Sequence, residues 1–345
     1  MKVANELTHW QKTRRPLCLA IGFFDGVHRG HARVIRETIR RARACGGEAW
    51  ALTFDPHPAR VLHPPTAPRL LTALPHKLRW LASLGLDGSL VLPFTRQLSQ
   101  RPPQNFLEHL LGSAPTLTHV LVGPNWRFGK NRAGTTATLS RFARTHGFHA
   151  TSVPPARHGG QPISSTRIRN AIAAGDLTAA TAMLGRPFSI LGPVVRGARI
   201  GHTLGYPTAN VPPASEVLPP YGIYAARALI GQAVHDGVVS YGVRPTIDKT
   251  PGAPALIELH LFDFNANLYG HEIEIFFVRR LRDERTFASL NALRGQIARD
   301  VVASRRILAM RKKLKEFPLH YAQARIIVRP NNTKEQKTTQ GKARR

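Results

Sequence analysis

The stretch LCLAIGFFDGVHRGH, residues 17–31, decides the fold of this chain. It begins as an apolar run of strand length, Leu17–Phe24, and passes through a glycine-rich turn into a helical pattern from about Arg29 to Ala44. A buried strand that leads directly into a helix is the repeating unit of an α/β domain. The start of such a helix presents free backbone N–H groups that favour an anion, and glycine lets a ligand approach the backbone. The stretch therefore predicts an α/β fold with a phosphate-binding turn.

The same alternation continues to about residue 185. Further strands are expected at Glu48–Phe54, Gly88–Phe94 and His119–Gly123, with helices near Pro75–Leu84 and Pro103–Leu111. Strands and helices at this spacing predict a doubly wound parallel sheet. Ligands of such sheets bind at the carboxyl ends of the strands.

The pattern changes after Pro187. Short strand-like runs separated by Gly/Pro turns extend from Phe188 to Arg280, in the segments SILGPVV, GIYAARALI, DGVVSYGV, LIELHLFDF and HEIEIFFVRRL. These runs predict an antiparallel barrel, with a sandwich as the alternative, and a helical pattern follows from about Thr286 to Lys315. We therefore expect a doubly wound α/β domain over 1–186, an antiparallel β-barrel domain with a terminal helix over 187–312, and a basic tail over 313–345.

Composition restricts the class of protein. The chain has 345 residues, of which 42% are hydrophobic and 20% charged, so it can fill two ordinary cores and is neither fibrous nor wholly disordered. No run approaches the roughly 18 to 20 consecutive apolar residues of a membrane span, and the first residues show no signal-peptide pattern. Two cysteines, Cys18 and Cys45, cannot form a disulfide framework. We expect a soluble cytoplasmic protein.

The net charge of +29 first suggests a nucleic-acid partner. However, the positive residues are mostly Arg and are spread along the whole chain. The densest block, residues 311–345, ends in a polar segment that cannot bury enough surface to order itself, so an inert extension is expected and a nonspecific RNA or membrane-surface contact is the alternative. Arginine also pairs with phosphate oxygens in a bidentate manner, so charge alone does not choose between nucleic acid and a polyphosphate substrate.

Two motifs in the first domain suit phosphate chemistry. His28 and His31 share one face of a helical turn and can both donate hydrogen bonds to one phosphate chain. Elsewhere a His-x-x-His pair is more often a metal site or a surface coincidence, but its place in a glycine-rich strand-to-helix turn favours phosphate. The segment ISSTRIR, residues 163–169, opens another helix with hydroxyls that alone would be read as N-caps, next to Arg167 and Arg169.

Two further segments of this domain could line a ligand. The loop GPNWRFGK, residues 123–130, is not a Walker loop because its spacing is one residue too long and Asn131 replaces Ser/Thr. The segment FDPHP, residues 54–58, is rigid and is either a wall for a planar ligand or a simple turn.

The second domain carries a candidate metal-binding turn and a candidate base. Thr208 and Asn210, in the turn GHTLGYPTAN, offer a hydroxyl and an amide oxygen that suit Mg²⁺, although this tetrapeptide alone would be an ordinary turn. Glu258 lies inside the apolar run LIELHLF. It either points to solvent by alternation or serves as a general base that takes a proton from an alcohol.

The first set of motifs resembles a known family. In this order, GFFDGVHRGH, TFDPHP, the loop 123–130 and ISSTRIR resemble the FMN adenylyltransferase module of bacterial bifunctional riboflavin kinase/FAD synthetases. The resemblance implies that His28 and His31 are catalytic residues that hold the ATP phosphates, and that the FMN phosphate attacks the α-phosphorus without a protein nucleophile. It assigns ATP or phosphate binding to Gly22, Phe24, Asp25, Gly30, Asn125, Ser165, Thr166 and Arg169, and flavin contact to Phe54, Pro56 and Pro58. Phe23 stands where this family is expected to have Asn.

The second set of motifs resembles the riboflavin kinase module of the same family. The matching segments are GPVVRGARIGHTLGYPTAN, YGIYAA, GVRPT, ELHLFDFNANLYG and RLRDERTFASLNALRGQIARD. The resemblance implies that Thr208 and Asn210 hold Mg-ATP and that Glu258 deprotonates the terminal ribityl hydroxyl for attack on the γ-phosphate. It assigns the nucleotide loop to Gly197, Gly205 and Pro207, and flavin contact to Arg282, Glu284 and Phe287. His202 and Ser240 depart from the Arg and Asn expected in this family.

We therefore expect a cytoplasmic enzyme with two sites that converts riboflavin to FMN and FMN to FAD, with ATP as co-substrate and Mg²⁺ as cofactor. Its partners are the small molecules riboflavin, FMN and ATP, with no membrane, no specific nucleic acid, and at most a weak or transient homo-oligomer. Two alternatives remain open. The changes at 202 and 240 could have silenced the kinase, or the chain could be a basic nucleic-acid-binding protein.

Overall fold

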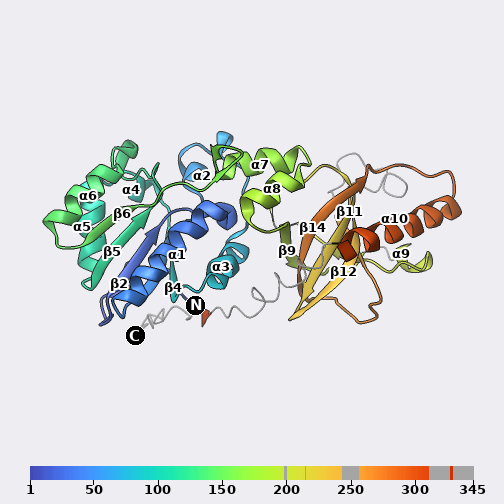
Figure 1. Ribbon diagram of the computed structural model, residues 1–345, viewed down its shortest axis with the longest axis horizontal. Coiled ribbons are helices and arrows are strands. Elements are labelled where there is room, and N and C mark those ends of the chain that lie inside the picture. The colour runs from blue at the N-terminus through green and yellow to red at the C-terminus, as the bar shows by residue number, and fades with distance from the viewer. Residues whose placement is uncertain (198–199, 214, 243–255, 311–326, 329–345) are drawn as a thin grey trace, which may run out of the picture.

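The computed structural model describes residues 1–197, 200–213, 215–242, 256–310 and 327–328. Two domains of different architecture lie side by side along the long axis of the molecule (Figure 1). The first contains a parallel sheet covered by helices, and the second contains an antiparallel sheet with one long helix outside it. The expected fold class is therefore confirmed for both domains.

Every neighbouring pair in the first sheet is parallel. The strand order is β15-β1-β4-β3-β2-β5-β6. From β2 the chain builds the sheet outward in one direction through β3 and β4, and later returns to place β5 on the other side of β2. Ligands bind at such a topological switch point, which here lies between the carboxyl ends of β2 and β5. The strands are β1 (Lys2–Ala4), β2 (Leu17–Ile21), β3 (Glu48–Asp55), β4 (Gly88–Pro93), β5 (Leu117–Val122), β6 (His149–Ser152) and β15 (Ile327–Val328).

Helices cover both faces of this sheet because side chains alternate along each strand. Cys18, Ala20 and Val91 share one buried cluster with residues of α1 and α3, whereas Leu19 and Val120 share another with residues of α5 and α6. The helices of this domain are α1 (Arg29–Ala44), α2 (Pro58–Leu62), α3 (Leu74–Ser83), α4 (Arg96–Ser99), α5 (Pro103–Ser113) and α6 (Thr136–Thr145). Short 3₁₀ turns are η1 (Leu7–Trp10), η2 (Asp25–Val27), η3 (Pro64–Thr66) and η4 (Lys130–Arg132).

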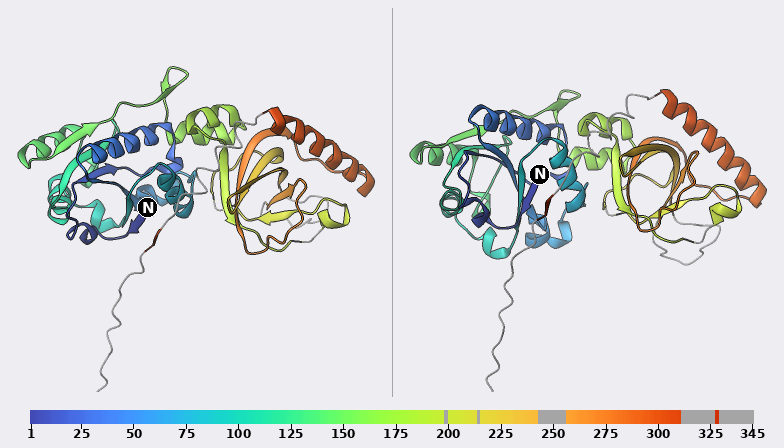
Figure 2. Two further views of the ribbon diagram at one scale, coloured as in Figure 1. Left: turned by 60° about the horizontal axis from the view of Figure 1, so that its bottom comes forward. Right: turned by 90° about the horizontal axis from the view of Figure 1, so that it is seen from below.

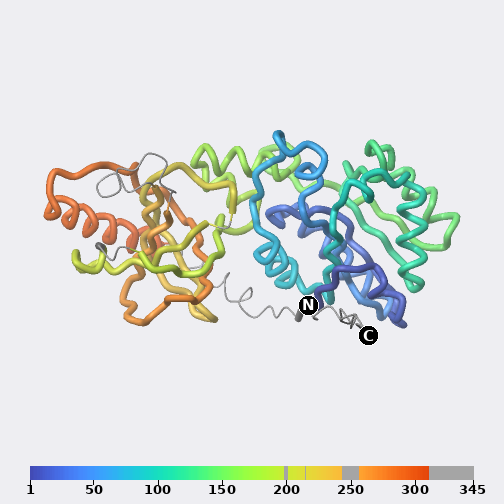
Figure 3. Tube along the Cα trace, turned by 180° about the vertical axis from the view of Figure 1, so that it is seen from behind, coloured from blue at the N-terminus to red at the C-terminus, as the bar shows by residue number. Residues whose placement is uncertain are grey.

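The junction between the domains is a packed pair of helices. After the short strands β7 (Arg157–His158) and β8 (Gln161–Pro162), the chain forms α7 (Ser165–Ala173) and α8 (Leu177–Leu184), which lie between the two sheets (Figure 3). Buried residues of both helices share one apolar cluster with the interior of the barrel. The expected boundary near 184–190 therefore contains no free linker, and helices that precede it in sequence complete the core that follows it.

The second domain is an antiparallel barrel. Its strand order is β10-β13-β12-β11-β14-β9, and an isolated bridge between Val195 and Asn210 joins the two edges. Helix α10 packs on the outside of the barrel (Figure 2), where Ser304 donates a hydrogen bond to the carbonyl of Gly237. The elements are β9 (Phe188–Pro193), α9 (Ile200–Thr203), β10 (Ala209–Val211), β11 (Gly222–Ile230), β12 (Ala233–Gly242), β13 (Leu256–Leu261), β14 (Glu272–Arg282) and α10 (Leu290–Met310).

Some boundaries differ from the sequence prediction. The strand expected over Leu17–Phe24 ends at Ile21, because the backbone then enters a left-handed turn. The helix expected from Thr286 begins at Leu290, and its predicted end at Lys315 lies outside the described residues. Most of the expected tail, residues 313–345, also lies outside them, but residues 327–328 form β15, which pairs with β1. The described residues include no helix that is long and apolar enough to cross a membrane.

Candidate active sites

The turn before α1 has an unusual backbone. Phe24, Gly26 and Val27 have φ values of 57°, 76° and 37°, a left-handed conformation that is rare for residues with a side chain. The turn lies at the carboxyl end of β2, directly at the switch point of the sheet. His28 then caps α1, because its Nδ1 accepts a hydrogen bond from the backbone N–H of His31 at 3.3 Å. The remaining proton of a neutral His28 is therefore on Nε2.

The two histidines form a stacked pair. Their ring centroids are 3.6 Å apart and their planes differ by 16°. Burial, assisted by the positive charge of Arg186, lowers the pKa of His28 to about 4. Burial and the neighbouring His28 hold the pKa of His31 well below its usual value. Both imidazoles are therefore neutral at neutral pH, and each offers one N–H donor without a full charge.

The residues around this pair have packing roles. The ring of Phe24 is buried and meets the ring of His31 edge-on, with centroids 5.4 Å apart. A Cβ atom at Gly22 would come within 2.9 Å of the Phe24 ring, and one at Gly30 would come within 3.0 Å of the His28 ring. Gly22, Phe24 and Gly30 thus pack against the histidine pair, and the ATP contact expected of them from the sequence stays a prediction.

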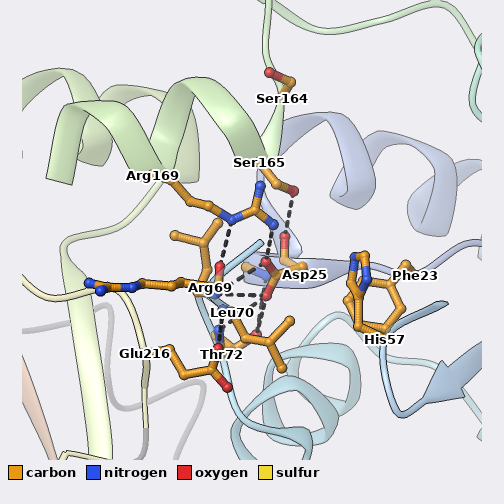
Figure 4. A network of polar contacts seen from close by, with 12 residues as sticks. Phe23, Asp25, His57, Arg69, Leu70, Thr72, Ser164, Ser165, Arg169 and Glu216 are labelled. Atoms are coloured by element: carbon orange, nitrogen blue, oxygen red, sulfur yellow. Dashed lines mark hydrogen bonds and ion pairs between the residues drawn. The ribbon is translucent and has the colours of Figure 1, made fainter. Parts of the chain in front are cut away.

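Asp25 and Arg169, both expected at the phosphates, are bound to each other (Figure 4). The Asp25 carboxylate is buried, lies 2.8 Å from Nη2 of Arg169, and accepts hydrogen bonds from the backbone N–H groups of Leu71 and Thr72. Nε of Arg169 donates to the carbonyl of Arg69 at 2.7 Å. These two contacts use Nε and Nη2 of Arg169, and a guanidinium has further N–H donors that a phosphate could accept.

The start of α7 lies beside this ion pair. The hydroxyl of Ser165 donates to the carbonyl of Asp25 at 3.0 Å, whereas Ser164 is the N-cap residue and Thr166 is exposed. Arg167 donates to three backbone carbonyls, those of His158, Gln161 and Pro162. The structure therefore brings Ser165 and Arg169 to the His28 turn and uses Arg167 to hold the preceding hairpin.

The expected flavin wall follows β3, the next strand of the sheet. Phe54 is half-buried and meets Phe94 edge-on, while Pro56 is exposed and Pro58 begins α2. Asn125 is exposed in the loop after β5, on the other side of β2. These residues and the His28 turn occupy the same carboxyl-terminal edge of the sheet.

Sequence reasoning missed two buried cations at this edge. Lys77 lies 4.3 Å from the centroid of the Phe23 ring and donates to the carbonyl of Phe23 and the hydroxyl of Thr53. Burial lowers the pKa of Lys77 to about 8. Arg186 donates to the carbonyls of the turn itself, at Gly26 and Val27. A signal was present for Arg186, which stands in the otherwise apolar segment MLGRPFSIL, but not for Lys77, which has His76 and Arg79 beside it.

In the barrel, strand register assembles the second site. Asn210 on β10 is directly opposite Glu258 on β13, which is directly opposite Ser240 on β12. Directly paired residues point to the same face of a sheet. Because Ile257 and Leu259 point into the barrel core, Glu258 points to the outer face, where it is half-buried. The alternation predicted for this strand is therefore correct, and the outer face carries the candidate base.

A glycine-rich segment covers Asn210. A Cβ atom at Gly197 would overlap the Asn210 amide, and one at Gly201 would lie 3.2 Å from the hydroxyl oxygen of Thr208. Gly205 has a φ of 83°, which turns the chain toward Pro207, whose carbonyl oxygen lies 2.9 Å from Nδ1 of His260. Thr208 and Asn210 are thus held on one side of the loop.

A second carboxylate lies near Glu258. The pKa of Glu284 is raised by burial and by the negative charge of Glu258. Glu284 also packs against the backbone of Gly242 so closely that a Cβ atom there would overlap its carboxylate. The sequence assigned Glu258 and Glu284 to different tasks, and the structure brings them into one electrostatic environment.

The remaining expected flavin contacts lie where β14 leaves the barrel. Arg282 forms a bidentate ion pair with Asp300 of α10, with distances of 3.0 Å from Nε and 2.7 Å from Nη2. Its guanidinium lies 5.8 Å from the centroid of the half-buried Phe287 ring. Arg282 therefore connects the end of β14 to α10. Phe287 is the aromatic residue of this segment that a flavin could contact.

The donor set of the barrel site fits Mg²⁺. Thr208 and Asn210 carry neutral oxygen donors, and the carboxylate of Glu258 lies opposite Asn210 on the neighbouring strand. The space that Gly197 leaves over the Asn210 amide would be filled by any side chain. Mg²⁺ keeps several waters and is usually held by few protein ligands together with substrate phosphates. Within the described residues no group of three or more His, Cys, Asp or Glu side chains could hold a metal by itself.

Comparisons with known proteins agree with this division into two sites. A family model for FAD synthetase matches residues 10–167, and one for riboflavin kinase matches residues 184–308. The bifunctional riboflavin kinase/FMN adenylyltransferase of Escherichia coli strain K12 is 38% identical over 295 residues, which cover 85% of this chain and 93% of that protein. The protein of the same name from Pseudomonas fluorescens is 34% identical over 309 residues, covering 90% and 98%.

A solved structure shares the arrangement of both domains. The crystal structure of a macrolide-efflux protein from Streptococcus pneumoniae superimposes with a TM-score of 0.75 at 28% identity, covering 87% of this chain and 96% of that one. The two family matches fall on the parallel-sheet domain and on the barrel, in the order that the motifs predicted. This chain therefore belongs to the bifunctional riboflavin kinase/FMN adenylyltransferase family.

Proposed function

We propose that the parallel-sheet domain makes FAD from FMN and ATP at the His28 turn, and that the barrel makes FMN from riboflavin and ATP at Glu258. One observation supports this division: each domain carries its own group of polar residues suited to bind phosphate. One group lies at the switch point of the parallel sheet, and the other lies on the outer face of the barrel. ATP is the co-substrate of both steps.

In the adenylyl transfer, a phosphate oxygen of FMN attacks the α-phosphorus of ATP and the bond to pyrophosphate breaks. His28 and His31 donate neutral N–H groups to the phosphate chain, so they orient it without fixing a charge. Positive charge comes from Arg169 and Lys77. Catalysis is then alignment and charge stabilisation, with no covalent enzyme intermediate.

In the kinase step, Glu258 takes the proton of the terminal ribityl hydroxyl while that oxygen attacks the γ-phosphorus and ADP leaves. Glu284 lies in the same electrostatic environment, where burial and the negative charge of Glu258 raise its own pKa. Thr208 and Asn210 would hold Mg²⁺ together with the ATP phosphates. A bound ion would neutralise phosphate charge in this site.

The two-site assignment is tested by product analysis. Wild-type protein with riboflavin, ATP and Mg²⁺ should form FMN and then FAD. The double variant His28→Ala/His31→Ala should stop at FMN, and Glu258→Ala should make FAD only from added FMN. If either variant stayed folded and lost both activities, the division into two sites would be wrong.

The same experiment addresses the two alternatives. A protein silenced at His202 and Ser240 would make FAD from FMN but no FMN from riboflavin. A nucleic-acid-binding protein would show neither product and would bind RNA in a salt-sensitive manner that truncation of the tail reduces. Location in the cytoplasm, the lack of a specific nucleic-acid partner and weak or transient self-association stay predictions.

A further inference from the structure

Arg186 occupies a place that neither active site explains. It lies between α8 and β9, at the junction of the domains, and only 6% of its surface is exposed. A buried guanidinium is costly unless it is well partnered. Arg186 therefore requires a structural or functional reason.

The partners of Arg186 are in the turn that ends at His28. Its Nη2 donates to the carbonyl of Gly26 at 2.6 Å, and its Nη1 donates to the carbonyl of Val27 at 3.0 Å. Both of these residues have the left-handed backbone described above. Such a backbone persists only where the surroundings hold it, and buried carbonyls need donors. Arg186 supplies hydrogen-bond donors to these two carbonyls and thereby holds the left-handed backbone directly before His28.

The charge of Arg186 acts on the same site. It is the second cause, after burial, of the low pKa of His28, and it also lowers the pKa of His31. Arg186 thus favours the neutral imidazoles that the stacked pair requires. The hydrogen bonds of Arg186 and its positive charge therefore both act on the His28 turn.

A series of side-chain contacts connects Arg186 to the barrel through α3. Its guanidinium stacks 3.9 Å from the centroid of the Trp80 ring. Nε1 of Trp80 lies 2.8 Å from Nε2 of His76, and that atom lies 2.8 Å from Oε1 of Glu274 on barrel strand β14. Ser189 of β9 donates to the same Glu274 oxygen at 2.6 Å. His76 and Glu274 are almost fully buried, so this cluster is a fixed contact between the domains.

We propose that Arg186 is a positioning residue for adenylyl transfer, which holds the backbone of the His28 turn and is itself held in place by the barrel through Trp80, His76 and Glu274. The proposal rests on the assignment of His28 and His31 to adenylyl transfer. It implies that the adenylyl transfer site is complete only when the barrel is docked against α3.

The test uses full-length Arg186→Lys and Arg186→Met, with Arg43→Gln as the control, because Arg43 pairs with Asp87 in an exposed ion pair remote from the turn. Lysine keeps the charge but cannot reach two carbonyls with a planar fork. Both Arg186 variants should lower kcat for FAD formation on the order of 10- to 100-fold, while the KM for ATP changes less and riboflavin phosphorylation is unchanged. Arg43→Gln should match wild type in both reactions.

The pH profile separates positioning from simple loss of structure. Removing the positive charge in Arg186→Met should raise the pKa of His28, so the acid limb of FAD formation should move to higher pH. Arg186→Lys should move it less, because the charge is kept. Wild-type FAD formation in both Arg186 variants would overturn the proposal, as would equal losses of both activities with unshifted profiles.

Two further variants test the contacts from Arg186 to the barrel, and they keep the proposal testable if the Arg186 variants do not fold. Glu274→Gln should lower FAD formation several-fold and leave the kinase rate unchanged. Trp80→Phe keeps a ring beneath the guanidinium and removes the indole N–H, so it should behave like Glu274→Gln. If both retained wild-type FAD formation, the proposed connection would be refuted. A wild-type protein that made no FAD would instead refute the assigned function.

Discussion

The two candidate active sites differ in the kind of backbone that carries them. The His28 turn is a left-handed backbone segment with neutral imidazoles, and its shape depends on contacts with residues up to 160 positions away in sequence, such as Arg186. The Glu258 site is a row of side chains on regular antiparallel strands, and its geometry follows from register. The first site therefore depends on individual side-chain contacts to an irregular turn, and the second on the regular pairing of strands. Substitutions at one site should therefore leave the other reaction unchanged.

The largest effect is expected at the glycine segment over Asn210. Gly197→Ala places a Cβ atom on the Asn210 amide, so either the loop or the turn that carries Thr208 and Asn210 must move. Riboflavin phosphorylation should fall on the order of 100-fold, and FAD formation from FMN should stay at the wild-type rate. Steady-state rates of the two half-reactions measure this. Gly112→Ala is the control because nothing lies within 4 Å of its added methyl group.

Asp25→Asn tests whether the first site depends on its internal ion pair. Asparagine keeps one acceptor for the Leu71 and Thr72 N–H groups but loses the charge that pairs with Arg169. We expect FAD formation to fall about tenfold and the domain to lose about 1–3 kcal/mol of stability. The kinase rate should not change.

Asp87→Asn is the matched control for that variant. Asp87 also accepts a backbone N–H, from Ala49, and pairs with an arginine, but it lies where β3 and β4 begin, at the opposite edge of the sheet. Denaturant unfolding should show a loss in both variants, whereas only Asp25→Asn should slow FAD formation. Equal slowing by both would mean that Asp25 acts through stability alone.

Lowering the pH should reduce the free energy of unfolding before it reduces the rate of FAD formation, because the folded protein keeps His28 and His31 neutral. The pKa of His28 is lowered to about 4, so unfolded chains bind more protons than folded ones between about pH 6.5 and 4. Stability should therefore fall as the pH is lowered through this window, by on the order of 3 kcal/mol for His28. FAD formation should persist below pH 6, because the imidazoles stay neutral. Urea unfolding and initial rates across pH 4.5 to 8 test both, and an acid limb near pH 6.5 would contradict the neutral pair.

The smallest effect is expected from Ser240→Asn, which introduces the residue expected in the family. Ser240 is opposite Glu258 on the neighbouring strand, so the new amide can contact that carboxylate. One added hydrogen bond is worth about 1 kcal/mol, which corresponds to a change of about two- to tenfold in the KM for ATP or riboflavin. FAD formation is the internal control. No change in either constant would show that the departure at 240 is neutral.

The sequence predicted the order of elements better than their ends. The helix expected from Arg29 to Ala44 has those bounds in the structure, because apolar periodicity and a capping histidine define it locally. The strand expected to reach Phe24 stops at Ile21, because an apolar run does not reveal a left-handed turn. The outward face of Glu258 could be predicted because alternation is a property of the strand itself, whereas its pairing with Asn210 joins two distant strands.

The sequence by itself determined the two domain classes, the motifs and the edges at which they lie, since these depend on local periodicity and spacing. Only the tertiary structure decided that Asp25 is bound to Arg169, that Phe24 supports His31, and that the barrel reaches the first site through Glu274 and His76. These contacts join residues that are far apart in the chain. Their partners are selected by packing and by the need to satisfy buried polar groups, which no local pattern records.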